Sequence, residues 1–170
     1  LPDIQGDSFS CIDARDIDGD GDDEIAVGAE SGHVYCLNAD GSLRWSFNTH
    51  TTVRDLAWID FQGDGRCWLV AGGVGGEVFA IDHSGNAQWT YQIPTYKRTG
   101  HIRTVFSADL EGNGRQIAMV GAENWRYYAL DRDGKKLWHY ESVHPSTKGI
   151  ALDVDGDGKQ EVALGTAYYT

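Results

Sequence analysis

The acidic stretch Asp16-Ile17-Asp18-Gly19-Asp20-Gly21-Asp22-Asp23-Glu24 leads directly into the apolar run Ile25-Ala26-Val27-Gly28. It returns near the C-terminus as Asp153-Val154-Asp155-Gly156-Asp157-Gly158-Lys159-Gln160-Glu161, followed by Val162-Ala163-Leu164-Gly165. The first Asp of the stretch recurs at spacings of 44, 49 and 44 residues, as Asp16, Asp60, Asp109 and Asp153. The same offsets relate Trp45, Trp89 and Trp138. A fixed period of this size is typical of repeat architectures, so the chain consists of one unit repeated four times, the last time incompletely.

Each repeat has the pattern of four short β-strands. In the first repeat the strands are expected at residues 10–15, 24–29, 33–38 and 43–48, between turns rich in Gly, Asp and Asn. The second strand is apolar on both faces, which is typical of a strand between two neighbouring sheets. A repeated four-stranded antiparallel unit of this length is typical of a propeller blade.

We therefore predict an all-β fold, a β-propeller of four-stranded antiparallel blades, with about three and a half blades in this chain. Residues 1–170 would form a single propeller segment, with repeats at approximately 10–53, 54–102, 103–146 and an incomplete 147–170. A ring needs about four to eight blades. We expect further blades from another copy of the chain or from a longer parent chain.

The two complete acidic stretches have the composition of calcium-binding loops. Calcium prefers about six to eight oxygen ligands, which closely spaced carboxylates around glycine turns supply. The expected ligands are the side chains of Asp16, Asp18, Asp20 and Glu24 with the carbonyl of Asp22, and those of Asp153, Asp155, Asp157 and Glu161 with the carbonyl of Lys159. The last ligand, a Glu, stands at position 9 of each loop, whereas an EF-hand has it at position 12, and the flanking residues are predicted to form strands. Neither loop is therefore an EF-hand.

The two middle repeats keep the turn but lose the ligands. The second loop retains Gly63 and Gly65 but carries Gln62 and Arg66, and the third is altered in the same way, with Arg115. We expect the glycines to serve the turn geometry and the middle loops to be free of metal, with an Arg in place of the cation.

Composition and charge restrict the partners. A net charge of −12 argues against a nucleic-acid backbone as the main partner, because phosphate binding needs clustered cations.

The three cysteines, Cys11, Cys36 and Cys67, form neither a disulfide framework nor a zinc motif. We expect them to be small buried residues, and one disulfide between two of them stays an open alternative. No run approaches the roughly 18 to 20 apolar residues of a membrane span, and no signal peptide is visible. We expect no membrane insertion and a mature or excised chain.

Two families share these motifs. The loops 16–24 and 153–161, each leading into a strand that ends in Gly, resemble the FG-GAP/VCBS calcium-binding repeats of integrin-like and secreted bacterial propellers. The segments 36–45, 80–89 and 129–138 are similar to the tryptophan-docking repeats of quinoprotein-like (PQQ-like) propellers, in which the Trp packs between adjacent blades. The first resemblance implies calcium and a location outside the cytoplasm, namely extracellular, periplasmic or at the cell surface. The second implies a bound redox quinone, and with it a quinone-dependent dehydrogenase.

A ligand is expected on the propeller face opposite the acidic loops, which we call the top face. The five residues that lengthen the second spacing fall in a connection on this face, where repeat proteins often carry functional insertions. The candidate ligand-binding residues are Arg54, Tyr96, His101, Arg103, Trp125 and Arg126. Arg side chains would pair with carboxylates of a glycan or protein ligand, and Trp125 or Tyr96 would stack on sugar rings. Alternatively, these cations only offset the acidic face, and the aromatic rings cap the blade edges.

Besides the quinone-dependent dehydrogenase that the second resemblance implies, the sequence leaves two functions from different classes. The first is a calcium-stabilised binding or scaffold module of a secreted or cell-surface protein, without catalysis of its own. The alternative is part of the catalytic propeller of a polysaccharide lyase or related carbohydrate-active enzyme, in which Tyr96 or His101 would act as a base beside Arg103.

Overall fold

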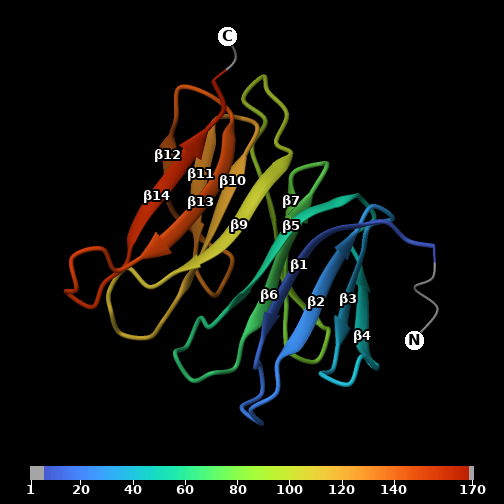
Figure 1. Cartoon of the computed structure of the whole chain (residues 1–170). Helices are drawn as coiled ribbons and strands as arrows, with labels where there is room; N and C mark the ends of the chain where they lie inside the picture. The colour runs from blue at the N-terminus through green and yellow to red at the C-terminus, as the bar shows by residue number, and fades with distance from the viewer. Residues whose placement is uncertain (1–5, 169–170) are drawn as a thin grey trace.

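Strands account for all of the regular secondary structure of residues 6–168, the part of the chain that the computed structural model describes. They form three four-stranded antiparallel sheets and one two-stranded sheet, which confirms the predicted all-β class and the partial propeller (Figure 1). The first two sheets are built from β1 (Phe9–Arg15), β2 (Glu24–Ala29), β3 (His33–Leu37), β4 (Leu43–Asn48), β5 (Val53–Ile59), β6 (Trp68–Gly73), β7 (Glu77–Ile81) and β8 (Ala87–Gln92). The other two are built from β9 (Ile102–Ala108), β10 (Ile117–Ala122), β11 (Arg126–Leu130), β12 (Lys136–Glu141), β13 (Ser146–Leu152) and β14 (Glu161–Thr166).

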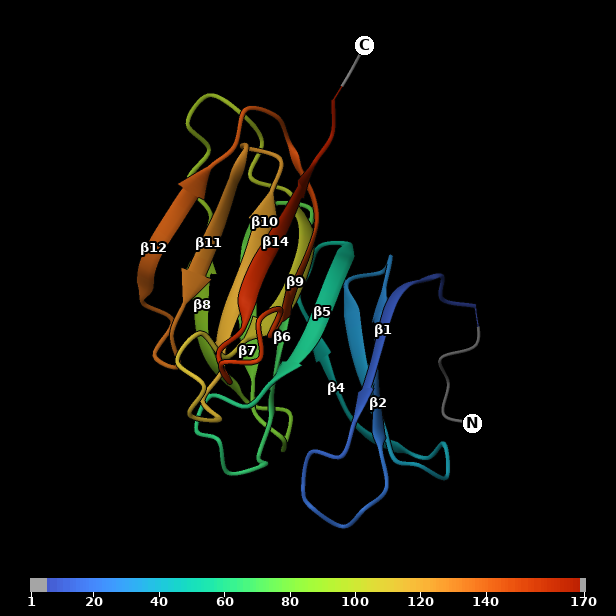
Figure 2. The same ribbon diagram turned by 60° about the vertical axis from the view of Figure 1, so that its left-hand side comes forward.

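Each sheet is one blade, and its strands are hydrogen-bonded in chain order. The first strands of successive blades, β1, β5, β9 and β13, pack against one another, and the sheets fan out from them side by side (Figures 1 and 2). The loops between the first and second strands lie at the same end of each blade, which in Figure 1 points downward for the first two blades and toward the lower left for the last two. The long connection between β8 and β9 lies at the opposite end, the top face.

The hydrophobic core lies between the blades. One cluster of buried side chains joins the first and second blades, another the second and third, and a smaller one the third and fourth. The second strand of a blade contributes to two of these clusters, as Leu69 and Val70 of β6 do on opposite faces. Its apolar sequence therefore follows from burial on both sides.

Two of the repeated tryptophans dock on the next blade, as the tryptophan-docking resemblance implied. The indole of Trp45 donates to the carbonyl of His83 at 3.1 Å, and that of Trp89 donates to Arg132 at 2.7 Å. A Cβ added to Gly85 would come within 2.8 Å of the Trp45 ring, so a glycine is needed for this close approach.

The fourth blade is open in the described part of the chain. β14 pairs only with β13. Trp138 is 38 % exposed, compared with 9 % for Trp45. Val154 is 67 % exposed, although its counterpart Ile17 is fully buried. These surfaces lack the neighbouring strands that cover the equivalent residues of the first two blades.

The four loops between first and second strands share one backbone design. The carboxylate of the first Asp accepts N–H groups from its own turn: Asp60, for example, accepts bonds from Gly63 and Gly65, and Asp153 from Gly156 and Gly158. The glycines of these turns have positive φ in all four loops. The first Asp and the glycines thus stabilise the turn whether or not the metal ligands are present, as expected for the glycines.

The cysteines are all free thiols, and the disulfide that the sequence left open is not formed. Cys36 and Cys67 are buried as expected, whereas Cys11 is only partly buried. Among residues 6–168 no helix is long and apolar enough to cross a membrane.

Candidate functional site

The two acidic loops each bring three carboxylates together. Oxygen atoms of Asp16, Asp18 and Glu24 lie within 4.8 Å of one another, and the same holds for Asp153, Asp155 and Glu161. The donor set consists of hard oxygen atoms on a tight turn, and it fits the preference of calcium. These are clusters that can bind a metal ion.

The side chains of two expected ligands, Asp20 and Asp157, lie outside these groups of three, and the backbone carbonyls of Asp22 and Lys159 stay predicted ligands. Asp20 accepts the backbone N–H of Asp22 at 2.9 Å, and Asp157 accepts that of Lys159 at 2.8 Å. The ammonium group of Lys159 also approaches the Asp157 carboxylate at 3.8 Å. In this geometry the carboxylates of Asp20 and Asp157 hold the turn together.

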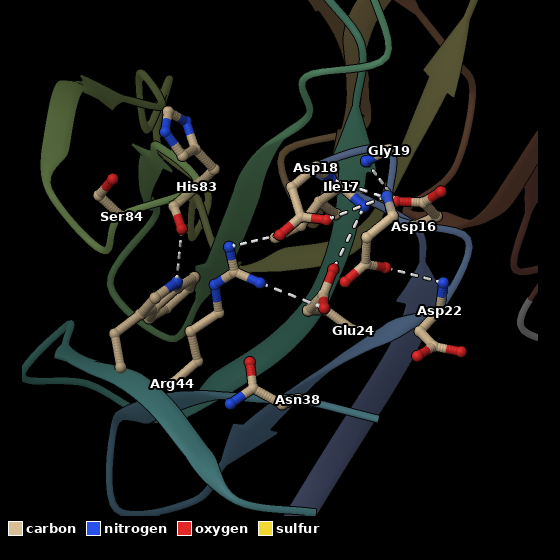
Figure 3. A network of polar contacts seen from close by, with 12 residues as sticks. Asp16, Ile17, Asp18, Gly19, Asp22, Glu24, Asn38, Arg44, His83 and Ser84 are labelled. Atoms are coloured by element: carbon tan, nitrogen blue, oxygen red, sulfur yellow. Dashed lines mark hydrogen bonds and ion pairs between the residues drawn. The ribbon is translucent and has the colours of Figure 1, made fainter. Parts of the chain in front are cut away.

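Arg44 is a member of the first cluster that the sequence did not suggest. From β4 its guanidinium reaches Asp18 at 2.8 Å and Glu24 at 3.2 Å (Figure 3). Glu24 is only 2 % exposed, and burial raises its pKa, against the opposing effects of the Ile17 N–H and of Arg44. Arg44 thus supplies the charge that this buried carboxylate requires.

The middle loops have no comparable cluster of acidic groups in the described residues. Arg66 and Arg115, expected in place of the cation, make no ion pair there with a carboxylate of residues 6–168. Instead, Gln116 of the third loop clamps the second loop: its backbone N–H donates to the Asp60 carbonyl and its side-chain oxygen accepts the Asp60 N–H, both at 2.8 Å.

On the top face, the connection 93–101 lies against the turn 122–126 of the next blade. The side chain of Asn124 donates to the Pro94 carbonyl at 2.7 Å, and the N–H of Glu123 donates to the carbonyl of His101 at 2.9 Å. Tyr96 and Lys97 both have positive φ, so the inserted connection has a defined and strained shape.

Glu123 is the centre of a charged network. Its carboxylate accepts the Thr99 hydroxyl at 2.6 Å and lies 3.4 Å from His101, while its other oxygen pairs with Arg103. Burial alone would raise the pKa of Glu123, but the Thr99 hydrogen bond and the Arg103 charge outweigh it and lower the pKa. Glu123 is therefore ionised at neutral pH and neutralises Arg103.

Two arginines stack on two aromatic rings beside this network. The Arg98 guanidinium lies 3.8 Å from the centre of the Trp125 ring, and Arg126 lies 3.8 Å from that of Tyr96. Arg126 also pairs with Glu141 at 2.8 Å. A pocket of about 400 Å³ opens here, lined by Arg98, Thr99, Arg103, Glu123, Trp125 and Pro145.

The structure gathers most of the expected top-face residues in one region. Arg103 and Trp125 line the pocket, His101 contacts its Glu123, and Tyr96 stacks with Arg126 nearby. Arg54 is exposed on β5 and does not line this pocket.

Arg98, Thr99 and Glu123 line the pocket but were not among the predicted ligand-binding residues. The sequence nevertheless contains a signal for this site. The third residue of the turn between second and third strands is Gly32 in the first blade, Gly76 in the second and Trp125 in the third. A bulky residue at a position that is glycine in the other blades indicates a functional site, because residues in unfavourable backbone conformations cluster at such sites.

Comparison with known proteins gives a family match. A family model described as the lambda-carrageenase beta-propeller domain matches residues 6–74 and again 68–151. Among curated proteins, the lambda-carrageenase of Pseudoalteromonas carrageenovora is 54 % identical over 33 residues, which cover 19 % of this chain and 4 % of that enzyme. A lambda-carrageenase of another Pseudoalteromonas species matches equally. The matching segment is thus a small part of these much longer relatives.

Solved structures share the fold. BBS1N, solved in complex with ARL6DN, aligns with a TM-score of 0.73 at 17 % identity, over 94 % of this chain and 46 % of its own. The rhamnogalacturonan lyase of Bacillus licheniformis aligns with a TM-score of 0.71 at 19 % identity, over 94 % of this chain and 40 % of its own. At such identities the likeness concerns the fold alone. Both neighbours are larger chains of which this propeller segment covers less than half.

Proposed function

Since this chain belongs to the lambda-carrageenase beta-propeller domain family, we propose that it is part of the propeller of a carbohydrate-active enzyme and binds an anionic polysaccharide on its top face. The alternative function from the sequence is thereby preferred to the binding or scaffold module. The further blades of this propeller would come from a longer parent chain, in keeping with the partial coverage of the relatives.

The observation that carries the proposal is the pocket where connection 93–101 meets turn 122–126. It combines two guanidinium groups, a carboxylate and a hydroxyl group in about 400 Å³. Guanidinium groups recognise carboxylate and sulfate-like anions, and the other polar groups can accept and donate hydrogen bonds to sugar hydroxyls. The acidic loops lie at the other end of the blades, so that their charge is kept away from an anionic ligand.

We assign this part of the propeller to substrate binding. A base or acid must reach the reacting atoms, but Tyr96 and His101, the bases considered above, do not line the pocket. His101 instead contacts Glu123. In this account the residues that cleave the polymer lie elsewhere in the enzyme.

Calcium is assigned a structural role in the loops 16–24 and 153–161. When bound, it would offset the mutual repulsion of Asp16, Asp18 and Glu24, or of the equivalent carboxylates of the last loop. A polymeric substrate does not cross membranes, so the proposed function also places the protein outside the cytoplasm: extracellular, periplasmic or at the cell surface.

Binding of this chain to lambda-carrageenan, measured by affinity electrophoresis with neutral dextran as the comparison polymer, tests the proposal. We expect retardation by lambda-carrageenan alone, and about tenfold weaker binding for Arg103→Ala, since a hydrogen bond to a charged group contributes about 1.5 kcal/mol or more. Arg66→Ala removes the same charge from the opposite end of the blades and should bind like the wild type. Equal losses in the two variants would indicate unspecific charge attraction and contradict the proposal.

A further inference from the structure

Arg98 differs from Arg103 and Arg126 because it makes no direct ion pair with a carboxylate of residues 6–168. Arg103 pairs with Glu123, and Arg126 of the neighbouring stack pairs with Glu141. The charge of Glu141 acts on Arg98 only from beyond contact distance, and Glu141 is already paired with Arg126. Arg98 is an exposed residue, and its guanidinium lies on the Trp125 ring.

The backbone conformation of Trp125 is unfavourable for a residue with a side chain. In all three complete blades the same turn is closed by the same backbone hydrogen bond: Gly32 to Ala29 at 3.1 Å, Gly76 to Gly73 at 3.4 Å, and Trp125 to Ala122 at 3.3 Å. The third position has φ of 93° and 80° at the two glycines and 70° at Trp125. A side chain in this left-handed region is less stable than glycine by about 1 kcal/mol.

The indole contacts groups of the protein itself. Arg98 lies over the ring, and the His144 ring lies beside it at 5.8 Å between centroids. Trp125 therefore presents the face of its ring to the connection 93–101, where the Arg98 guanidinium stacks on it. A stacked guanidinium keeps its edge N–H groups free, and these N–H groups form the fork that pairs with planar or tetrahedral anions.

From these contacts we propose that Arg98 is the anion-binding residue of the pocket and that Trp125 is a positioning residue that acts through it. The anion is a sulfate or carboxylate group carried by the polysaccharide, so the inference rests on the proposed function. Arg103, paired with Glu123, keeps that carboxylate from repelling the anion and donates a further hydrogen bond to the anion.

The key variant is Trp125→Gly, which restores the residue of the other two turns. Because glycine fits this φ, the relief of backbone strain offsets part of the packing lost with the indole, and the variant should unfold cooperatively in urea as the wild type does. It should nevertheless bind lambda-carrageenan about as weakly as Arg98→Ala does, on the order of tenfold below the wild type. The double variant should bind no more weakly than Arg98→Ala, because both changes remove one unit.

Three binding results would contradict three different parts of the proposal. If the wild type binds but both single variants equal it, Arg98 is not the receptor and only this inference fails. If Trp125→Gly weakens binding further in the Arg98→Ala background, Trp125 contacts the sugar directly and its positioning role is wrong. If the wild type does not bind lambda-carrageenan at all, the proposed function fails with it.

Discussion

At the scale of single residues, equivalent glycines have very different surroundings. Gly41 and Gly134 occupy the same turn position, with φ of 80° and 74°. A Cβ on Gly41 would meet nothing within 4 Å, whereas one on Gly134 would lie 2.8 Å from the Trp89 ring. The difference isolates the contribution of tryptophan docking from that of backbone conformation.

We predict that Gly41→Ala lowers the free energy of unfolding by about 1 kcal/mol, the cost of a side chain at positive φ. Gly134→Ala should cost about 1 to 3 kcal/mol more, because the added methyl group displaces the docked indole. Urea unfolding followed by tryptophan fluorescence measures both. Equal losses would mean that docking of Trp89 adds nothing to stability.

The buried thiols give a second prediction at this scale. Burial raises the pKa of Cys36 to about 12 and that of Cys67 to about 11. A raised pKa in the folded state means that stability is complete below the ordinary thiol pKa of about 8.5 and is lost as the pH rises toward these values.

Between pH 8 and pH 11, the wild type should therefore lose more stability than Cys36→Ala does, by on the order of 2 kcal/mol. Urea midpoints of the two proteins at both pH values give the comparison, and the variant corrects for tyrosines that titrate in the same range. Parallel losses would contradict the burial of an un-ionised thiol at this position.

At the scale of the elements, the loops between first and second strands combine a shared turn with unequal ligand sets. Asp155 and Glu111 occupy the same third position of the loop, but only Asp155 belongs to a cluster of three carboxylates. The pair is therefore a matched test of the calcium proposal.

We predict that calcium at about a hundred times its dissociation constant stabilises the wild type by about 2.7 kcal/mol per site, or several degrees in melting temperature. Asp155→Asn should abolish the stabilisation that calcium gives at the last loop. Glu111→Gln should leave the stabilisation by calcium unchanged. A melting temperature that does not change between excess calcium and excess chelator would refute a structural ion in either loop.

The sequence predicts the strands of the fold but not the side-chain contacts between separate elements. The alternation of apolar and polar residues and the Asp-Gly turns locate the strands, and β2 and β4 begin and end as predicted. The contact of Arg44 with Asp18 and Glu24 depends on how strand β4 lies beside a loop 20 residues away. The stacking of Arg98 on Trp125 likewise depends on packing between blades, so spacing along the chain does not reveal it.

At the scale of the whole molecule, the burial of the docking tryptophans reports how the propeller continues. Trp45 is buried against the second blade, whereas Trp138 is on the open side of the third. Tyr140 beside it is also exposed, at 56 %, although its counterpart Phe47 packs on Phe79 of the next blade. This surface matches the docking surfaces of the first two blades.

We predict that, in this chain, Trp45→Ala lowers the free energy of unfolding by about 3 to 5 kcal/mol and Trp138→Ala by less than about 1 kcal/mol. In a longer polypeptide that completes the fourth blade, Trp138→Ala should become as costly as Trp45→Ala, and the Trp138 emission should shift to shorter wavelength. No change of either quantity in the longer polypeptide would show that the next blade does not dock on Trp138.

The proposed function requires that the top face, and not the acidic loops, binds an anionic polysaccharide. Hydrogen exchange of this chain with and without lambda-carrageenan fragments distinguishes the two faces, because it locates the protected backbone. We predict slower exchange in residues 94–103 and 122–126, and unchanged exchange in residues 16–24 and 153–161. Protection confined to the acidic loops, or no protection anywhere, would contradict the proposed function.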